Sequence, residues 1–218
     1  MNAATLRARL AAPPDPILLP PSRAAHVPPE AIAVPLAGDD ARDIAAAGPL
    51  TPAAVLVPLV LGPAPGVLLT KRTAHLSSHA GQVSFPGGRI DPEDDSPEAA
   101  ALREAEEEIG LRRDWVELLG RLPAYATGTG FSITPVLGLL PEGVPLGALG
   151  LRPSVAEVEA VFELPLSVLL DPQAPQRRAT TFRGRLREFW VWPHPEHYIW
   201  GATAGILVNL AARLRGSA

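Results

Sequence analysis

The sequence predicts an α/β protein of the α+β type, in which a mixed β-sheet is sandwiched between helices and preceded by a Pro/Ala-rich N-terminal arm. Two observations predict this fold class. Apolar segments typical of strands interleave with segments typical of helices, without the regular alternation of a doubly wound sheet. Hydrophobic residues make up 47% of the 218 residues, which is enough for one sizeable core.

The first 52 residues are predicted to stand apart from the rest. Residues 1–12 suit a short helix, because Leu6 and Leu10 lie four residues apart on one side of it. Residues 13–52 are rich in Pro and Ala and only weakly periodic, which favours an arm that wraps the surface or is partly loose. We therefore expect an N-terminal helix and arm at 1–52 and a compact domain at 53–218.

The compact part is predicted to begin with two strands, at 53–61 and 66–72, which are separated by a turn-forming Gly-Pro-Ala-Pro. A polar, glycine-bearing loop is expected over 75–88. The remaining strands are expected at 115–127 and 131–140, joined at 128–130, then at 155–162, and as a pair about Gly184 over 180–192. A short helix is expected near 166–170 and a closing helix at 202–215.

The clearest predicted element is a helix over 96–109. Ser96 suits its N-cap, Pro97 its first position and Gly110 the residue after its end. At about 100° per residue, Leu102, Ala105 and Ile109 fall on one side and are expected to face the core.

Three glutamates of this helix, Glu104, Glu107 and Glu108, fall within an arc of about 100° on nearly the opposite side. Their mutual repulsion costs about 0.2–0.5 kcal/mol per pair, and the helix C-terminus disfavours each negative charge by about 0.3–1 kcal/mol. A divalent cation such as Mg²⁺ would turn this repulsion into attraction. The alternative is a solvated acidic helix face. Glu106 points elsewhere.

A calcium loop of the EF-hand type, starting at Asp91, is a second alternative. It fails because Ser96 stands where the turn glycine belongs and Leu102 where the bidentate glutamate belongs.

The longer stretch around the helix carries a motif. Gly87-Gly88-Arg89-Ile90-Asp91 leads into Arg103-Glu104-Ala105-Glu106-Glu107-Glu108-Ile109-Gly110-Leu111. This resembles the Nudix box, whose core is Arg-Glu, an apolar residue, any residue, Glu-Glu, any residue, Gly and an apolar residue. The spacing from Gly88 to Arg103 is one residue longer than in the general pattern, and Asp95 stands where the upstream glutamate would fall.

The segment before the box resembles the signature of the coenzyme A diphosphatase branch. It reads Leu68-Leu69-Thr70-Lys71-Arg72-Thr73-Ala74-His75-Leu76, and then His79-Ala80-Gly81-Gln82-Val83-Ser84-Phe85-Pro86-Gly87-Gly88. Two positions depart from that signature: Thr73 replaces Ser or Ala, and Ser77 replaces an arginine. Two further segments, 157–166 and 199–204, are similar to stretches typical of the family. The resemblance covers roughly residues 55–210.

The resemblance implies a Nudix fold and a set of site residues. Glu104, Glu107 and Glu108 would hold the divalent metal, Mg²⁺ or Mn²⁺, and Arg103 would orient the carboxylates. The general base stays open between a box glutamate and Glu157, whose alternative is an ordinary exposed strand residue. For Arg103 the alternative is a surface ion pair.

The substrate contacts are also implied. Arg72, Lys71 and Arg89 are candidates for the adenosine 3′-phosphate, with structural or solvated roles as the alternative. Gly87 and Gly88 would let the backbone approach phosphate or metal, where a plain turn is the alternative.

The pantetheine arm of coenzyme A needs an apolar trough, to which Tyr198 or Trp200 would contribute. Packing in the buried core is the alternative for Trp200.

The function expected from this resemblance is metal-dependent hydrolysis of the diphosphate linkage of coenzyme A or its thioesters to 3′,5′-ADP and 4′-phosphopantetheine. The alternatives are a Nudix hydrolase for ADP-ribose, a dinucleotide or a nucleoside triphosphate, and a non-catalytic nucleotide-binding Nudix module. Such a module would be expected to lose box glutamates, and this chain retains them.

Composition narrows the partners. A net charge of −4 argues against a nucleic-acid surface, and the absence of cysteine excludes disulfides, thiolate zinc sites and a cysteine nucleophile. No segment has the length of a signal peptide core or a membrane span. We therefore expect a cytoplasmic enzyme of a small nucleotide substrate, as a monomer or homodimer.

Overall fold

The computed structural model describes residues 2–11, 37–38, 44–45, 48–75, 80–182 and 185–216. Within these ranges the elements follow in the order α1 (Ala3–Ala11), β1 (Ala37–Gly38), β2 (Thr51–Val60), β3 (Gly66–Arg72), β4 (Val83–Ser84), β5 (Gly87–Arg89), α3 (Pro97–Ile109), η2 (Arg113–Trp115), β6 (Glu117–Arg121), β7 (Tyr125–Ala126), β8 (Phe131–Leu139), η3 (Leu146–Ala148), β9 (Val158–Pro165), α4 (Leu166–Leu170), β10 (Gln176–Phe182), β11 (Arg185–Trp192), β12 (Ile199–Trp200) and α5 (Gly201–Arg215).

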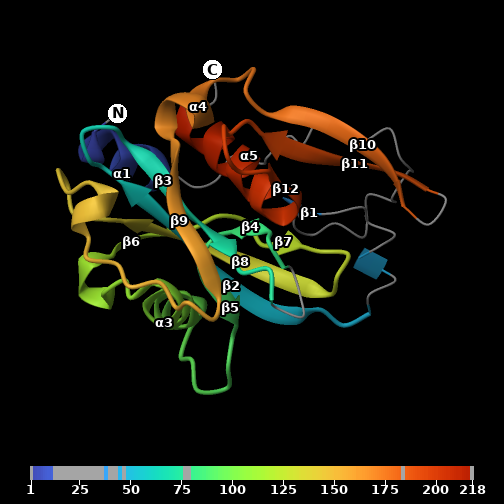
Figure 1. Cartoon of the computed structure of the whole chain (residues 1–218), viewed down its shortest axis with the longest axis horizontal. Coiled ribbons are helices and arrows are strands. Elements are labelled where there is room, and N and C mark those ends of the chain that lie inside the picture. The colour runs from blue at the N-terminus through green and yellow to red at the C-terminus, as the bar shows by residue number, and fades with distance from the viewer. Residues whose placement is uncertain are drawn as a thin grey trace.

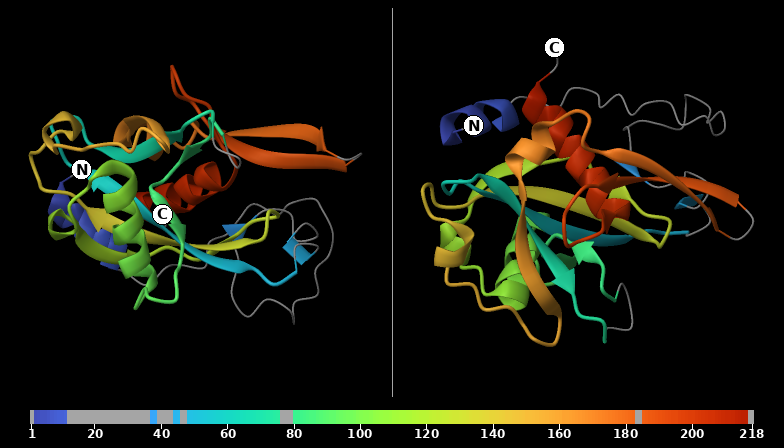
Figure 2. Two further views of the ribbon diagram at one scale, coloured as in Figure 1. Left: turned by 60° about the horizontal axis from the view of Figure 1, so that its bottom comes forward. Right: turned by 45° about the horizontal axis from the view of Figure 1, so that its top comes forward.

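A mixed sheet forms the centre of the molecule, as predicted. Its strand order is β1-β7-β8-β2-β3-β4, with β5 also paired to β2, β6 to β8 and β9 to β3. Strands β2 and β8 run parallel, while β2 with β3 and β3 with β9 run antiparallel. Helix α3 covers one face of this sheet, and α5 with α1 covers the other (Figures 1 and 2).

The two faces of the sheet belong to two hydrophobic clusters. In β2, Val57 and Leu59 pack with α1, α4 and α5, whereas Ala54 and Leu56 pack with α3. This alternation follows from the two-residue period of a strand, and it explains why nearly all of β2 is apolar: both of its faces are covered.

The N-terminal helix belongs to the main core. Leu6 and Leu10 are 0% and 1% exposed and pack against α5, and Arg7 forms an ion pair with Glu117 of β6 at 2.6 Å. The predicted spacing of Leu6 and Leu10 on one side is therefore confirmed. Strand β1, from the segment predicted as an arm, pairs with β7. The division at residue 52 stays a proposal.

A second sheet of three strands, β10-β11-β12, extends beyond the main sheet (Figure 1). The predicted strand pair is present, but it is longer than expected, because β10 already begins at Gln176. Trp192 joins it to α5, since its indole N–H donates to the carbonyl of Ala204 at 3.0 Å.

Three predicted boundaries were wrong. The loop over 75–88 contains two short strands, β4 and β5, whose partners β3 and β2 lie elsewhere in the sequence. The strand over 115–127 is divided into η2, β6 and β7, and the strand at 155–162 is β9, which begins later. In each case pairing with a distant strand decides the boundary. Among the helices of the described ranges, none is long and apolar enough to cross a membrane.

Candidate active site

Helix α3 carries the site, and its ends are built as the sequence predicts. The hydroxyl oxygen of Ser96 accepts from the N–H of Ala99 at 3.1 Å, and Gly110 adopts the left-handed conformation with φ 67°. Ala105 and Ile109 are buried against the sheet, and Leu102 packs at the margin of the same cluster. The helix therefore presents the glutamates of the box from a fixed scaffold.

Glu108 departs from its expected position on the outer face. It is only 3% exposed, because the helix turns it toward β3 and β5. The N–H of Gly87 donates to its Oε2 at 3.2 Å, and Arg72 donates to its Oε1 at 3.3 Å. Burial raises the pKa of Glu108 to about 7. The hydrogen bond from Gly87 and the charge of Arg72 oppose this rise, while the charges of Glu104 and Glu157 add to it.

Glu104 lies directly over the backbone of β5. A Cβ placed on Gly88 would stand 2.5 Å from Oε1 of Glu104, so this close approach requires glycine. Burial raises the pKa of Glu104. Arg103 opposes this rise, and the charges of Glu107 and Glu157 add to it. A Cβ placed on Gly87 would stand 2.4 Å from the carbonyl oxygen of Ala54, and the φ of Gly87 is 152°. These glycines bring the carboxylates and the sheet together; their predicted contact with phosphate stays a prediction.

Arg103 joins the acidic residues of the site. It donates to Oε1 of Glu104 at 3.0 Å and to Oε2 of Glu107 at 3.3 Å. On its other side Asp94 accepts two of its hydrogen bonds, at 2.9 and 3.1 Å, in a bidentate pair. This pair raises the pKa of Arg103 and lowers that of Asp94. Asp95, the residue that spacing places at the upstream glutamate, is exposed.

Asp94 is thus a residue that sequence reasoning missed. Its carboxylate is 7% exposed and also accepts from the N–H of Asp91 at 2.9 Å. The signal that points to it is the additional residue between Gly88 and Arg103, since one extra residue in the loop displaces the partner by one position.

Glu107 is the most open member of the trio, with its side chain 59% exposed. Glu106 forms an ion pair with Arg113 at 2.6 Å, away from the trio, as expected from the helical geometry.

Glu157 belongs to a separate loop, just before β9. This loop is tied to the end of α3, because Ser154 and Arg152 donate backbone N–H groups to the carbonyls of Glu108 and Ile109, both at 2.8 Å. Glu157 itself is exposed. Its charge contributes, as a smaller cause after burial, to the raised pKa of both Glu104 and Glu108.

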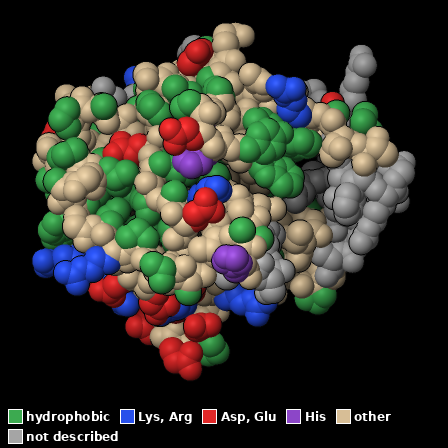
Figure 3. Space-filling view, in the orientation of Figure 1, with side chains coloured by type: hydrophobic (Ala, Val, Ile, Leu, Met, Phe, Trp, Pro, Cys, Tyr) green, Lys and Arg blue, Asp and Glu red, His purple; other side chains and the backbone are tan. Residues whose placement is uncertain are grey.

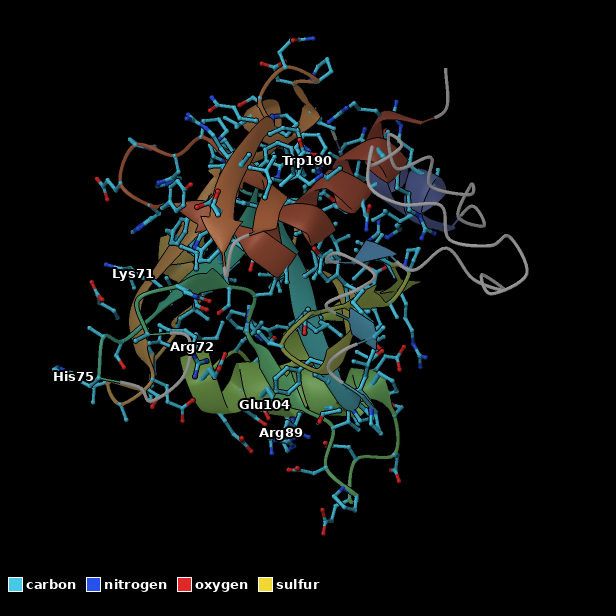
Figure 4. All side chains as sticks on the ribbon, turned by 90° about the vertical axis from the view of Figure 1, so that its right-hand side faces the viewer. Lys71, Arg72, His75, Arg89, Glu104 and Trp190 are labelled. Carbon is cyan, nitrogen blue, oxygen red and sulfur yellow. The ribbon has the colours of Figure 1, made fainter. Side chains whose placement is uncertain are left out.

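The three predicted phosphate cations lie in different surroundings (Figure 4). Arg72, at the end of β3, contacts Glu108, and its buried Nε has no hydrogen-bond partner. Lys71 points away from Arg72 and pairs with Glu159 at 2.6 Å. Arg89 lies beyond Glu104, where its guanidinium stands 5.7 Å from the ring centre of Phe131. The structure therefore brings Arg72, but not Lys71, to the carboxylates.

Of the aromatic candidates, Trp200 lies in β12 of the second sheet and Tyr198 just before that strand. Tyr198 and Trp200 are 58% and 39% exposed, and Phe189 stands edge-on to Trp200 with ring centres 5.6 Å apart. Figure 3 shows hydrophobic side chains gathered over this region of β11 and β12. The expected packing of Trp200 in the buried core is therefore wrong; Trp192 occupies that position instead, at 1% exposure.

The residues of the site fit a hard divalent cation. Carboxylate oxygens from Glu104, Glu107 and Glu108 are the ligands that Mg²⁺ and Mn²⁺ prefer, and glycine at position 88 leaves room for the Glu104 carboxylate over the backbone. Within the described ranges, no three His, Asp or Glu side chains stand in a ready-made coordination geometry. Side-chain rotation of the exposed Glu107 would have to complete the ligand set.

Comparison with known proteins agrees with this geometry. The model of the NUDIX domain family matches residues 50–184. The chain is 44% identical over 162 residues to an uncharacterized Nudix hydrolase, NudL, of Escherichia coli (strain K12), covering 74% of this chain and 82% of that one. The NudL of Shigella boydii matches equally. Among solved structures, the Nudix hydrolase RenU of M. smegmatis matches at 27% identity and TM-score 0.44, over 54% of this chain and 71% of that one. The NUDIX domain of Shewanella oneidensis NrtR, solved with ADP ribose, matches at 19% identity and TM-score 0.41, over 65% of this chain and 80% of that one.

The chain therefore belongs to the Nudix family. It is a Nudix hydrolase that acts on nucleoside diphosphate derivatives. Hydrolases of this family generally use divalent metal ions.

Proposed function

We propose that this enzyme hydrolyses the diphosphate linkage of coenzyme A or its thioesters to 3′,5′-ADP and a 4′-phosphopantetheine product. Mg²⁺ or Mn²⁺ would be held by Glu104, Glu107 and Glu108. The observation that carries the proposal concerns the segment that resembles the coenzyme A signature. Its Arg72 and Gly87 both donate to Glu108, which supports a substrate site next to the proposed metal ligands.

The bound cation would neutralise charge on the diphosphate and so ease nucleophilic attack at phosphorus. The residues of the chain account for the remaining work. Arg103 holds Glu104 and Glu107 in place, and the bidentate pair with Asp94 fixes Arg103 in turn. Water adds across the P–O–P bridge, one oxygen–phosphorus bond breaks, and two phosphate monoesters leave.

Glu157 is our candidate for the general base that takes the proton from the attacking water. It is exposed, and thus open to solvent, and its charge acts on both Glu104 and Glu108. A base must reach the reacting proton directly or through one water, and the loop that carries Glu157 is hydrogen-bonded to the end of α3, which supports this role. One of the box glutamates is the alternative base.

The cation for the adenosine 3′-phosphate is proposed to be Arg72 or Arg89. Arg72 has a buried Nε without an acceptor, and Arg89 is exposed. Lys71 is a weaker candidate, because it already forms an ion pair with Glu159. Tyr198 and Trp200 are exposed aromatic side chains available to the pantetheine arm.

A substrate panel tests this proposal. The purified chain with Mg²⁺, and separately with Mn²⁺, is offered coenzyme A, acetyl-coenzyme A, ADP-ribose, a diadenosine polyphosphate and a nucleoside triphosphate, and the products are identified by mass. We expect 3′,5′-ADP and 4′-phosphopantetheine from coenzyme A. Intact coenzyme A beside consumed ADP-ribose would refute the substrate and keep the reaction class. Tight binding without any cleavage would favour a nucleotide-binding module.

A further inference from the structure

The pairing of β3 with β9 contains an irregularity beside the site. From Gly66 opposite Pro165 to Lys71 opposite Ala160 the register is regular, and then Arg72 stands opposite Val158. One residue of β9, Glu159, is therefore extra, which is the defining feature of a β-bulge. Because side chains alternate across a strand, a shift of one residue moves every following side chain to the other face. The bulge thus decides which face Val158, the first residue of β9, takes, and Glu157 directly precedes it in the turn.

Two residues, Lys71 near the end of β3 and Thr73 directly after it, hold this bulge. Lys71, the only lysine of the chain, pairs with the extra residue Glu159 at 2.6 Å. Thr73 forms two hydrogen bonds with the turn before β9. Its N–H donates to the carbonyl of Glu157 at 2.9 Å, and its hydroxyl donates to the carbonyl of Ala156 at 3.1 Å. Thr73 is only 9% exposed, so its hydroxyl needs a partner inside the protein.

The exposed side chain of Glu157 has little packing to fix it, so its backbone sets its position. That backbone is tied on one side to Glu108 through Ser154, at 2.8 Å, and on the other to β3 through Thr73. We propose that Thr73 is a positioning residue of the hydrolase, which holds the turn before the bulged start of β9 and thereby keeps Glu157 in the position from which it takes the proton. This inference rests on the proposed function, in which Glu157 acts as the base.

A double-mutant cycle tests it. The wild type, Thr73→Val, Glu157→Gln and the double variant are compared by kcat and KM with coenzyme A and, in parallel, ADP-ribose, each with Mg²⁺. We expect Glu157→Gln to lower kcat by about 100-fold or more, as for a lost general base. Loss of one buried hydrogen bond predicts a fall of about 5–10-fold for Thr73→Val, at nearly unchanged KM. The double variant should match Glu157→Gln alone, because a positioning residue has no effect once its target is gone.

Two further variants serve as controls. Thr73→Ser keeps the hydroxyl and should retain most of the activity. Thr203→Val removes a comparable buried hydroxyl, which donates to the carbonyl of Val83 at 2.9 Å, and its effect should multiply with that of Glu157→Gln. If Thr73→Val does not fold, Thr73→Ala takes its place in the cycle.

The inference is overturned if Thr73→Val lowers kcat by the same factor with and without Glu157, since a general structural role would do that. A Glu157→Gln variant with normal kcat would overturn it as well. A wild type inactive on both probes refutes the proposed function, and the inference with it, whereas an active wild type with an additive cycle refutes the inference alone.

Discussion

The backbone N–H of Gly87 donates to Oε2 of Glu108 at 3.2 Å, which joins the glycine pair of β5 to a carboxylate that is almost completely buried. Both partners belong to the same sequence motif but to different elements. The hydrogen bond makes the turn before the helix part of the site, so changes in either partner should act on the same chemistry.

Glu107→Gln should lower kcat by about 100-fold or more while the fold is kept, because the exposed carboxylate at this position is proposed to hold the cation. The change is measured by steady-state kinetics over a Mg²⁺ titration, together with circular dichroism. Glu106→Gln is the matched control, since Glu106 pairs with Arg113 outside the trio. Near-normal turnover of Glu107→Gln would remove Glu107 from the metal site.

The stability of the metal-free protein should fall as the pH rises toward neutrality. Glu108 has a pKa of about 7 in the folded protein, above the ordinary value of 4.5, so the folded state binds more protons than the unfolded state between these values. The protonated carboxyl of Glu108 contributes its full share to the free energy of unfolding below about pH 4.5, and this contribution is lost as the pH rises through about 7. The shift corresponds to about 3 kcal/mol at most.

Thermal unfolding of the metal-free protein between pH 5 and pH 8 measures this effect. Glu108→Gln should flatten the slope and be the more stable protein at pH 8, whereas Mg²⁺ should stabilise only the wild type there. An unchanged slope in Glu108→Gln would assign the pH dependence to other groups.

Asp94→Asn should lower both Tm and kcat, because it removes the charge that holds Arg103 through two hydrogen bonds. A misplaced Arg103 loosens Glu104 and Glu107, and we expect kcat to fall by about 10-fold or more. Asp95→Asn changes an exposed neighbour of the same type and should leave both quantities unchanged. The reverse ranking of the two variants would return the role to Asp95.

Gly88→Ala should lower kcat by about 10–100-fold with little change in Tm. The new Cβ would stand 2.5 Å from Oε1 of Glu104, and that carboxylate can move away at the end of a flexible side chain, so activity is lost rather than stability. Gly147→Ala meets nothing within 4 Å and is the control.

Gly87→Ala should behave in the opposite way and unfold at a clearly lower temperature. Its Cβ would meet the backbone of β2, 2.4 Å from the carbonyl oxygen of Ala54, at a φ of 152° that disfavours a side chain. Equal Tm values for the Gly87 and Gly88 variants would contradict this distinction.

Features set by local chemistry were predictable from the sequence. The caps Ser96 and Gly110 bound α3 because capping depends on neighbouring backbone groups, and β3 was predicted at its observed bounds from its apolar run. The spacing of the motif likewise predicts that Glu104, Glu107 and Glu108 lie on one helix, and all three belong to α3.

Only the tertiary structure decided which of these residues contact one another. Glu108 is buried, with a raised pKa, because β3 and β5 pack over it. The periodicity of a helix says nothing of which strands pack against it, so this burial was not predictable. Asp94 rather than Asp95 pairs with Arg103 because the loop folds back on α3. Lys71 and Arg72 are adjacent in sequence but serve different partners, since neighbouring residues of a strand face opposite sides and the bulge at Glu159 then changes the register. Contacts between distant segments carry no periodic signal along the chain.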